Sequence, residues 1–199
     1  MKTFLTADWH LGENRFELMG RPFTSEQEMV HKLTLEHNLR IGDEDTVIVV
    51  GDVCYQKRPD YLKYVSWFNG RKILIRGNHD RGISDEEFKP YFEQIIPEGE
   101  GLEADFGGIQ CYVTHYPTCG VKDRFNLVGH IHGAWKYQLN MLNIGVDVNH
   151  YRPVDSDRIP FHFKAIAEFY DEDVWVANNP INAEYIGKRG KKGTYFTKV

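Results

Sequence analysis

The sequence has few cysteines and lacks several common targeting signals. Its 199 residues contain three cysteines, Cys54, Cys111 and Cys119, and no CxxC pair. This excludes a disulfide framework and argues against a thiolate zinc site. No stretch approaches 18 apolar residues, and the first residues lack the apolar segment of a signal peptide. We therefore expect a cytoplasmic protein without membrane contact.

A Gly-rich phosphate loop of the GxxxxGK[ST] type is also missing, which excludes a P-loop nucleotide hydrolase. There is no surplus of positive charge, since 24 Lys and Arg residues face 29 Asp and Glu residues. The basic residues are unevenly placed. Residues 188–199 hold five of them and no acid, which leaves 19 basic against 29 acidic residues in 1–187. We expect a single domain over 1–187 and a basic tail over 188–199, either solvated or in contact with nucleic acid.

Short apolar runs rich in β-branched residues alternate with helical patterns. Capping boxes begin at Ser25 and Ser84, Tyr61–Phe68 is expected to be helical, and Pro90 should end the segment after Ser84. This alternation predicts a layered α/β fold, with more strands in the second half. The predicted strands are Thr3–Ala7, Thr46–Val50, Lys72–Ile75, Ile109–Thr114, Asn126–Val128 and Leu142–Val146.

Five of these strands are followed directly by carboxylate, amide or imidazole side chains. In open α/β sheets, sites form beyond the carboxyl ends of parallel strands, so these five loops should converge. Extended backbone places residues i and i+2 on one side, which predicts that both members of a pair such as Asp8 and His10 face one centre. A glycine precedes three of the positions, where it lets the backbone turn sharply. The positions are Asp8, His10, Asp52, Asn78, His79, Asp80, His115, His130 and His132.

The chemistry of these groups favours a metal site. Mixed carboxylate, amide and imidazole ligands suit Mn²⁺, Fe or Zn²⁺ better than Ca²⁺ or Mg²⁺, which prefer oxygen. Seven candidate ligands would oversupply one ion, whereas two ions bridged by one carboxylate would use them all. We expect two divalent metal ions, with Mn²⁺ first and Fe, Zn²⁺ or Ni²⁺ as alternatives.

The ordered motifs resemble those of the calcineurin-like metallophosphoesterase superfamily. They are Asp8-x-His10, Gly51-Asp52, Gly77-Asn78-His79-Asp80, His115 and Gly129-His130-x-His132. Two further segments, Arg21-Pro22-Phe23 and residues 143–153, resemble a small prokaryotic and phage branch. The resemblance implies a four-layer αββα sandwich, in which two packed mixed β-sheets are flanked by helices.

The resemblance also implies roles for the motif residues. Asp52 would bridge two metals, and His79 would protonate the leaving oxygen with Asp80 orienting it. There are two departures from the branch: Glu13 stands where a histidine is expected, and Tyr55 stands where many members carry an acid. The remaining ligands would be Asp8, His10 and His132 for the first metal and Asn78, His115 and His130 for the second.

Together these features predict a metal-dependent phosphodiesterase or phosphatase. A metal-bridging hydroxide would attack the phosphorus of a small phosphodiester or nucleotide. Arg15 and Arg81 are the predicted substrate-binding cations, and the alternative for each is a surface ion pair. Two other functions stay open: a nuclease or nucleic-acid end-processing phosphatase that uses the basic tail, and a non-catalytic metal-binding scaffold. The oligomeric state has no signal in the sequence.

Overall fold

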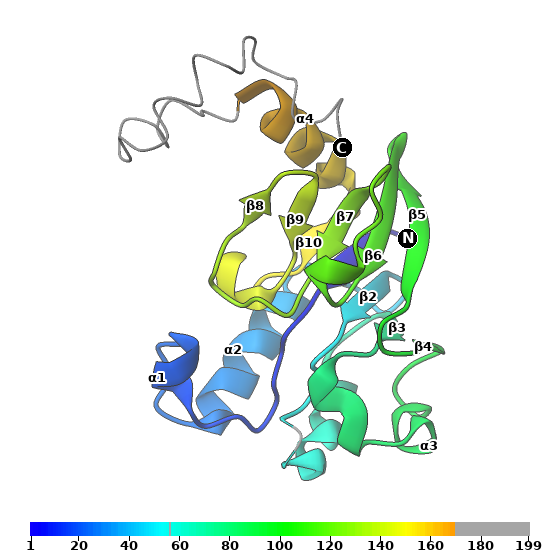
Figure 1. The fold of residues 1–199 in the computed structure, drawn as a ribbon. Coiled ribbons are helices and arrows are strands. Elements are labelled where there is room, and N and C mark those ends of the chain that lie inside the picture. The colour runs from blue at the N-terminus through cyan, green and yellow to red at the C-terminus, as the bar shows by residue number, and fades with distance from the viewer. Residues whose placement is uncertain (56, 170–199) are drawn as a thin grey trace.

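The computed structural model describes residues 1–55 and 57–169, with side chains as far as residue 166. It contains two five-stranded mixed sheets with helices packed around them (Figure 1). The sandwich predicted from the sequence is therefore confirmed. The domain boundary predicted at residue 187 and the basic tail lie outside the described residues.

The first sheet has the strand order β10-β1-β2-β3-β4. Strands β1 to β4 run parallel, and β10 pairs antiparallel with β1. The register places Thr6 beside Val49 and Val50 beside Ile75, so β1, β2 and β3 end at nearly the same level. The strands are β1 (Thr3–Thr6), β2 (Thr46–Val50), β3 (Arg71–Ile75), β4 (Gln94–Ile96) and β10 (Val154–Asp155).

The second sheet has the order β5-β6-β7-β9-β8. Its three central strands are parallel, and β5 and β8 form antiparallel edges. Thr114 lies beside Val128, so β6 and β7 also end at one level. The strands are β5 (Gly101–Phe106), β6 (Ile109–Thr114), β7 (Phe125–Val128), β8 (Tyr137–Gln138) and β9 (Met141–Asn143).

Side chains of the first sheet alternate between two cores because successive residues of a strand point to opposite faces. Leu5, Ile48 and Ile75 belong to a cluster with Val113 and Leu127 of the second sheet, which forms the core between the sheets. The alternate positions pack against the helical layer. They are Phe4, Val47, Val49 and Leu74, which cluster with Met29, Leu33 and Val65.

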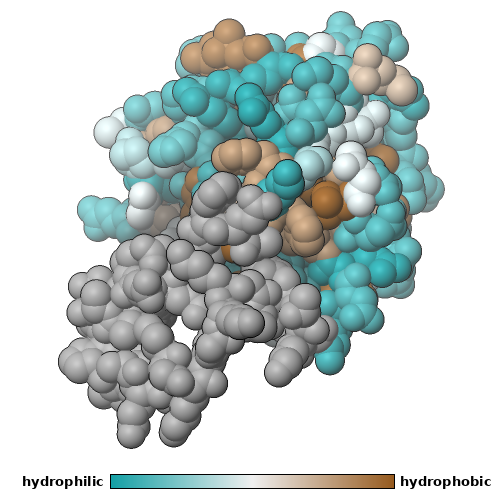
Figure 2. All heavy atoms as spheres, turned by 90° about the horizontal axis from the view of Figure 1, so that it is seen from above, coloured by the Kyte–Doolittle hydropathy of each residue, from teal (hydrophilic) through white to brown (hydrophobic). Residues whose placement is uncertain are grey.

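The longest helices are α2, on the first sheet, and α4. Met29 and Leu33 of α2 are buried in the outer core, and Ile159 and Ile166 of α4 join the core between the sheets. Seen from the end that α4 covers, the described surface is mostly hydrophilic, with a few apolar residues near its middle (Figure 2). The α-helices are α1 (Phe16–Met19), α2 (Glu26–Asn38), α3 (Asp85–Phe88) and α4 (Ile159–Phe169). The 3₁₀ helices are η1 (Pro59–Trp67), η2 (Asn78–Gly82), η3 (Pro117–Cys119), η4 (Val146–Val148) and η5 (Ser156–Arg158).

Five of the six predicted strands are confirmed to within one residue at each end. The sixth, expected over Leu142–Val146, is β9 and ends at Asn143. It stops there because the Asn143 side chain accepts a hydrogen bond from the N–H of Gly145 (2.8 Å), which turns the backbone out of the sheet.

The helix predictions are partly confirmed. The helix expected over Tyr61–Phe68 is the 3₁₀ helix η1. The capping box at Ser84 is present in full, and α3 ends before Pro90 as predicted. At Ser25 only half of the box forms, because the Glu28 carboxylate binds the N–H of Thr24. In the described part of the chain, every helix is too short or too polar to span a bilayer.

Candidate metal centre

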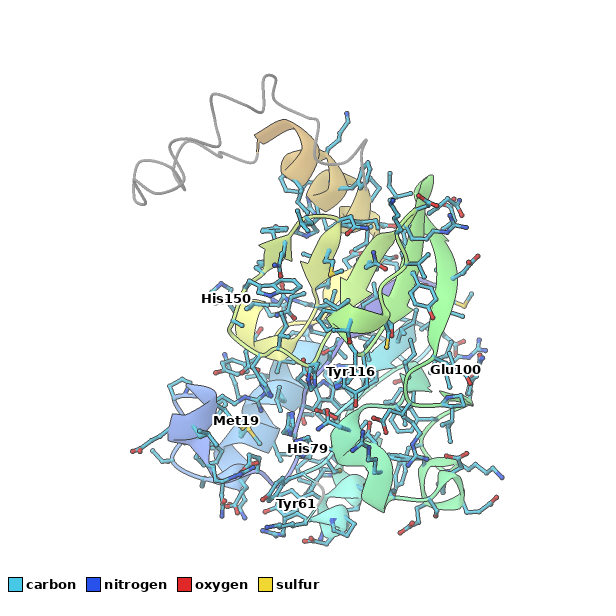
Figure 3. All side chains as sticks on the ribbon, viewed as in Figure 1. Met19, Tyr61, His79, Glu100, Tyr116 and His150 are labelled. Carbon is cyan, nitrogen blue, oxygen red and sulfur yellow. The ribbon has the colours of Figure 1, made fainter. Side chains whose placement is uncertain are left out.

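Five loops converge where the carboxyl ends of the two sheets meet. Three follow β1, β2 and β3 of the first sheet, and two follow β6 and β7 of the second. Backbone hydrogen bonds join neighbouring loops: the His10 N–H donates to the Asp52 carbonyl (2.9 Å), and the Gly129 N–H donates to the His115 carbonyl (3.1 Å). Figure 3 shows His79 in this central region of the molecule. The predicted convergence is present.

The side chains reach the centre from left-handed turns and not from extended backbone. Five candidate ligands have φ between 48° and 75°, a region that costs a non-glycine residue roughly 1–3 kcal/mol. The extended-chain argument for the two i, i+2 pairs was therefore wrong about the local conformation. Such strain is typical of sites that the surrounding fold holds in place. The five residues are Asp8, His10, Asp52, His130 and His132.

The Asp52 carboxylate lies between the two predicted ligand sets. Its Oδ2 is 3.4 Å from Nε2 of His10 and 3.5 Å from Nε2 of His115. Its Oδ1 accepts a hydrogen bond from the His79 N–H (2.8 Å). Burial alone would raise the pKa of Asp52, but the imidazoles of His10 and His115 and this hydrogen bond hold it below its usual range. One anionic oxygen thus faces an imidazole from each set.

Two glycines leave the space that this arrangement needs. A Cβ on Gly77 would lie 2.3 Å from Asp52 Oδ1, and one on Gly51 would lie 2.4 Å from His115 Nδ1. Gly51 also has φ of +79°, which a side chain rarely allows. The predicted sharp turn is therefore present at Gly51, whereas Gly77 is needed for close approach.

The donor set fits a divalent metal. Two groups have their ligand atoms within 4.8 Å of one another: Asp52 with His10 and His79, and Asp52 with His115 and His130. Nε2 of His10, the ring nitrogen that faces Asp52, is buried without a hydrogen-bond partner in the described part of the chain. Unpartnered imidazole nitrogens beside a shared carboxylate are what a metal would satisfy.

The other predicted ligands lie around these groups. Asp8 is fully buried, and both of its carboxylate oxygens accept from the His130 N–H (2.9 and 3.0 Å). Burial raises the pKa of Asp8 to about 6. The His132 ring is 4.9 Å from the His10 ring, and the Asn78 amide oxygen is 3.4 Å from His115 Nε2. The structure brings all seven predicted ligands together.

Comparison with known proteins agrees with this geometry. A family model described as calcineurin-like phosphoesterase matches residues 1–190. The chain belongs to this family. It is 26% identical over 171 residues to an uncharacterised protein of Methanocaldococcus jannaschii, covering 79% of this chain and 89% of that protein. It is 30% identical over 81 residues to the gene 66 protein of Mycobacterium phage L5, covering 39% of each.

A solved structure confirms the fold. The crystal structure of a protein of unknown function from Aquifex aeolicus superposes with a TM-score of 0.63 at 23% identity, covering 81% of this chain and 98% of that one. Family membership implies hydrolysis of phosphate esters with divalent metal ions, and the predicted resemblance is confirmed.

In this calcineurin-like phosphoesterase, the predicted ligand His132 contacts a buried ion pair that the sequence analysis did not assign. Nδ1 of His132 lies 2.8 Å from the Asp147 carboxylate, which also binds Arg21 in two hydrogen bonds (2.7 and 2.9 Å). Arg21 in turn donates to the carbonyls of Asp8 (2.6 Å) and Trp9 (3.0 Å). Burial would raise the pKa of Asp147, but His132 and Arg21 lower it to about 2. The network orients the ring of His132 through Nδ1, so that Nε2 is the nitrogen that could bind a metal.

Asn143 shapes the same loop from behind. Its amide nitrogen donates to the carbonyls of His132 and Trp135, both at 2.8 Å. The amide of Asn149 binds the carbonyls of Asn143 (3.1 Å) and Gly145 (2.8 Å). Asn143, Asp147 and Asn149 lie in residues 143–153, the segment that resembles the phage branch. The resemblance assigned no role to these three residues, and their spacing in the sequence does not indicate one.

The contacts of Asp80 differ from its predicted role of orienting His79. Its carboxylate accepts from the N–H groups of Asp52 (2.9 Å), Val53 (2.9 Å) and Gly77 (2.8 Å). These bonds use both oxygens, and no contact joins the carboxylate to the His79 ring in the described part of the chain. Burial, and then the charge of Asp52, raise the pKa of Asp80 to about 7. Asp80 ties the second and third motif loops together.

The two predicted substrate-binding arginines both have carboxylate partners. Arg81 forms a bidentate pair with Glu98 (2.7 and 2.6 Å) and is 68% exposed. Arg15 forms a bidentate pair with Glu13 (2.9 and 2.7 Å) and lies over the ring of Tyr55, 4.9 Å from its centroid. The ion-pair alternative therefore holds for the contacts of both.

Arg15 contacts both residues that differ from the phage-branch pattern, Glu13 and Tyr55. Glu13 is buried, and the same carboxylate also accepts from the N–H groups of Asn14 and Arg15. Burial would raise the pKa of Glu13, but its bonds with Arg15 lower it to about 2. The Tyr55 ring lies 6.0 Å from the His79 ring. Glu13 and Tyr55 together hold the Arg15 guanidinium on the His79 side of the centre.

Proposed function

We propose that this protein is a dinuclear metal-dependent phosphoesterase that hydrolyses a small phosphodiester or nucleotide. The observation that carries the proposal is the position of Asp52 Oδ2, 3.4 Å from an imidazole of one ligand set and 3.5 Å from an imidazole of the other. A carboxylate in that position suits a bridge between two ions. A single site would not need both histidines beside one oxygen.

The first ion would be held by Asp8, His10 and His132. Asn78, His115 and His130 would hold the second, and Asp52 would serve both. Two divalent ions there would polarise the phosphoryl oxygens and make an attacking water more acidic. The protein supplies the geometry: the turns after the strands, the Asp80 bonds between loops, and the Asp147 carboxylate behind His132.

His79 is the proposed proton donor to the leaving oxygen. Its ring lies 4.6 Å from the His10 ring, and its N–H to Asp52 places it beside the proposed centre. No side-chain hydrogen bond of the ring is seen in the described part of the chain, which supports a ring free to carry a proton. Arg15, held by Glu13 and Tyr55, is the proposed contact for a substrate phosphate.

The test compares two variants of the purified full-length protein. Metal content and hydrolysis of p-nitrophenyl phosphate, bis-p-nitrophenyl phosphate and an alkyl phosphate ester are measured with added Mn²⁺. Asp52→Ala should abolish activity and empty at least one site. His79→Ala should keep both metals and lower turnover about 10²- to 10⁴-fold on an alkyl ester. The loss should be smaller on p-nitrophenyl esters, whose leaving group needs little protonation.

Two results would contradict the proposal. Hydrolysis of neither ester under any of Mn²⁺, Fe²⁺, Zn²⁺ and Ni²⁺ would favour the non-catalytic scaffold. Loss of one metal equivalent in His79→Ala would make His79 a ligand, as its group with His10 and Asp52 allows, and not the proton donor. Contact with nucleic acid through the tail stays a prediction, because residues 188–199 lie outside the described part of the chain.

A further inference from the structure

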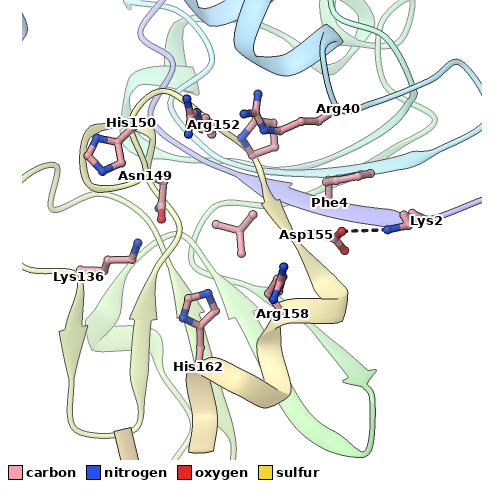
Figure 4. A pocket seen from close by; sticks show the side chains of 12 residues that line it. Lys2, Phe4, Arg40, Lys136, Asn149, His150, Arg152, Asp155, Arg158 and His162 are labelled. Atoms are coloured by element: carbon pink, nitrogen blue, oxygen red, sulfur yellow. Dashed lines mark hydrogen bonds and ion pairs between the residues drawn. The ribbon is translucent and has the colours of Figure 1, made fainter. Parts of the chain in front are cut away.

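A cavity of about 470 Å³ lies at the other end of β1 from the metal centre (Figure 4). The motif loop follows the carboxyl end of β1, whereas the cavity is lined by Lys2 and Phe4 near its amino end. Its other walls come from residues 149–153 and β10, from Arg40 after α2, from the residues around the start of α4, and from Lys136 just before β8. The volume lies within the range of sites that bind small molecules.

Cations dominate the wall of this cavity. Two of its arginines, Arg40 and Arg152, share one carboxylate of Glu36, each at 2.9 Å, and Lys2 pairs with Asp155 at 3.1 Å. Among the described lining residues, Asp155 is the single carboxylate. The lysines and arginines of the wall are Lys2, Arg40, Lys136, Arg152 and Arg158.

Lys136 and Arg158 have no carboxylate partner in the described part of the chain. Figure 4 shows them on one side of the cavity together with His162, opposite Arg40 and Arg152. Burial lowers the pKa of Lys136, and burial followed by the charges of Lys136 and Arg158 lowers that of His162. Among the described residues, the half-buried Lys136 and the exposed Arg158 thus face the cavity without a carboxylate partner, on a chain whose overall charge is negative.

We propose that this cavity binds a compact phosphate-bearing anion of nucleotide size, with its phosphate oxygens on Lys136 and Arg158. The guanidinium matches phosphate in bidentate geometry, and the ammonium adds a point charge. Phe4, Pro153 and Val154 give the wall an apolar part for a sugar or base. Because the cations surround one cavity, a compact anion reaches them together. The inference is independent of the hydrolytic function proposed for the metal centre.

The test measures binding of two probes to the Mn²⁺-loaded full-length protein by calorimetry. The probes are α,β-methylene-ADP, which resists hydrolysis, and inorganic phosphate. Lys136→Gln and Arg158→Gln should each weaken binding of the tighter probe about 10-fold, since each removes a charged hydrogen bond. Tighter binding of the analogue than of phosphate identifies a nucleotide, and equal binding identifies the phosphate group alone. Hydrolysis of p-nitrophenyl esters should stay within about 2-fold, because neither residue belongs to the proposed metal centre.

The matched controls are Lys89→Gln and Arg71→Gln, which remove the same charges from exposed ion pairs elsewhere. They should bind both probes as the unaltered protein does. A second measurement avoids variants: the bound probe should protect Lys136 from amine labelling, read by peptide mass. The proposal is overturned if neither probe binds at millimolar concentration. It is also overturned if the Lys136 and Arg158 variants bind like their controls, or if Lys136 labels at the same rate with the probe present.

Discussion

The buried pair behind His132 gives the sharpest prediction about how the fold supports the metal centre. The change is Asp147→Ala. The Asp147 side chain is 6% exposed and that of Arg21 is 0% exposed, so the substitution leaves a guanidinium in the protein interior with backbone carbonyls as its remaining oxygen partners. Breaking a buried pair in this way costs about 3–5 kcal/mol of unfolding free energy. The same change removes the oxygen that orients the His132 ring.

The expected magnitudes separate two effects of Asp147→Ala. The free energy of unfolding, measured by urea denaturation with a chelator present, should fall by about 3–5 kcal/mol. The affinity for Mn²⁺, measured by calorimetry, should fall about 10- to 100-fold, as is usual when a partner of a metal-bound histidine is removed. The control is Asp157→Ala, whose carboxylate is 72% exposed and 3.6 Å from Lys2. It should change stability by less than about 1 kcal/mol.

A double variant distinguishes an orphaned charge from a simple loss of packing. Combining Asp147→Ala with Arg21→Met removes the unpaired guanidinium, so the double variant should lose less stability than the sum of the two single losses. If Asp147→Ala does not fold, Asp147→Asn allows the same comparison because it retains one acceptor oxygen. Stability and Mn²⁺ affinity equal to those of Asp157→Ala would refute the reasoning.

Three further predictions concern other parts of the structure. Gly77→Ala should make the bound metal substoichiometric, because its Cβ would lie 2.3 Å from the central carboxylate, whereas Gly42→Ala, with no atom closer than 3.8 Å, should keep full metal content. Burial lowers the pKa of His37 to about 4, so below about pH 6.5 the unfolded chain binds a proton that the folded protein does not. Stability should therefore fall by about 2 kcal/mol between pH 7 and pH 5, and His37→Gln should flatten this slope in urea titrations. Glu13→Gln should weaken the hold on Arg15 and raise KM for a nucleotide substrate about 5-fold with kcat little changed; equal KM values would remove Arg15 from the substrate contacts.

The motifs and most of the strands could be predicted from the sequence because both depend on local patterns. A buried strand needs a run of β-branched residues, and a metal ligand needs one of a few side-chain types. Runs such as Thr46–Val50 and Ile109–Thr114 therefore match the structure residue for residue. The convergence of the five motif loops could also be predicted from these strand assignments, since the carboxyl ends of parallel strands lie at one edge of a sheet.

Local patterns misled where hydrogen bonds outside the regular strand ladder set the backbone. The turns at Asp8 and His10 are left-handed because loop-to-loop hydrogen bonds hold them, which the alternation of an extended strand cannot represent. The end of β9 at Asn143 depends on one side-chain bond to a nearby N–H, which a run of apolar residues hides.

By itself, then, the sequence determined which candidate ligand side chains this protein carries and which strands they follow. Tertiary structure alone decided the partners of those groups: Asp80 on the Asp52 loop, Asp147 between His132 and Arg21, and Tyr55 beneath Arg15. The basic cavity likewise corresponds to no sequence motif, since Lys136 and Arg158 come to line one cavity only in the folded structure. The physical reason is the separation along the chain of the residues that interact. Strand propensity and ligand type are properties of neighbouring residues, whereas a charge finds its counter-charge, or is left without one, through packing between segments far apart in the chain.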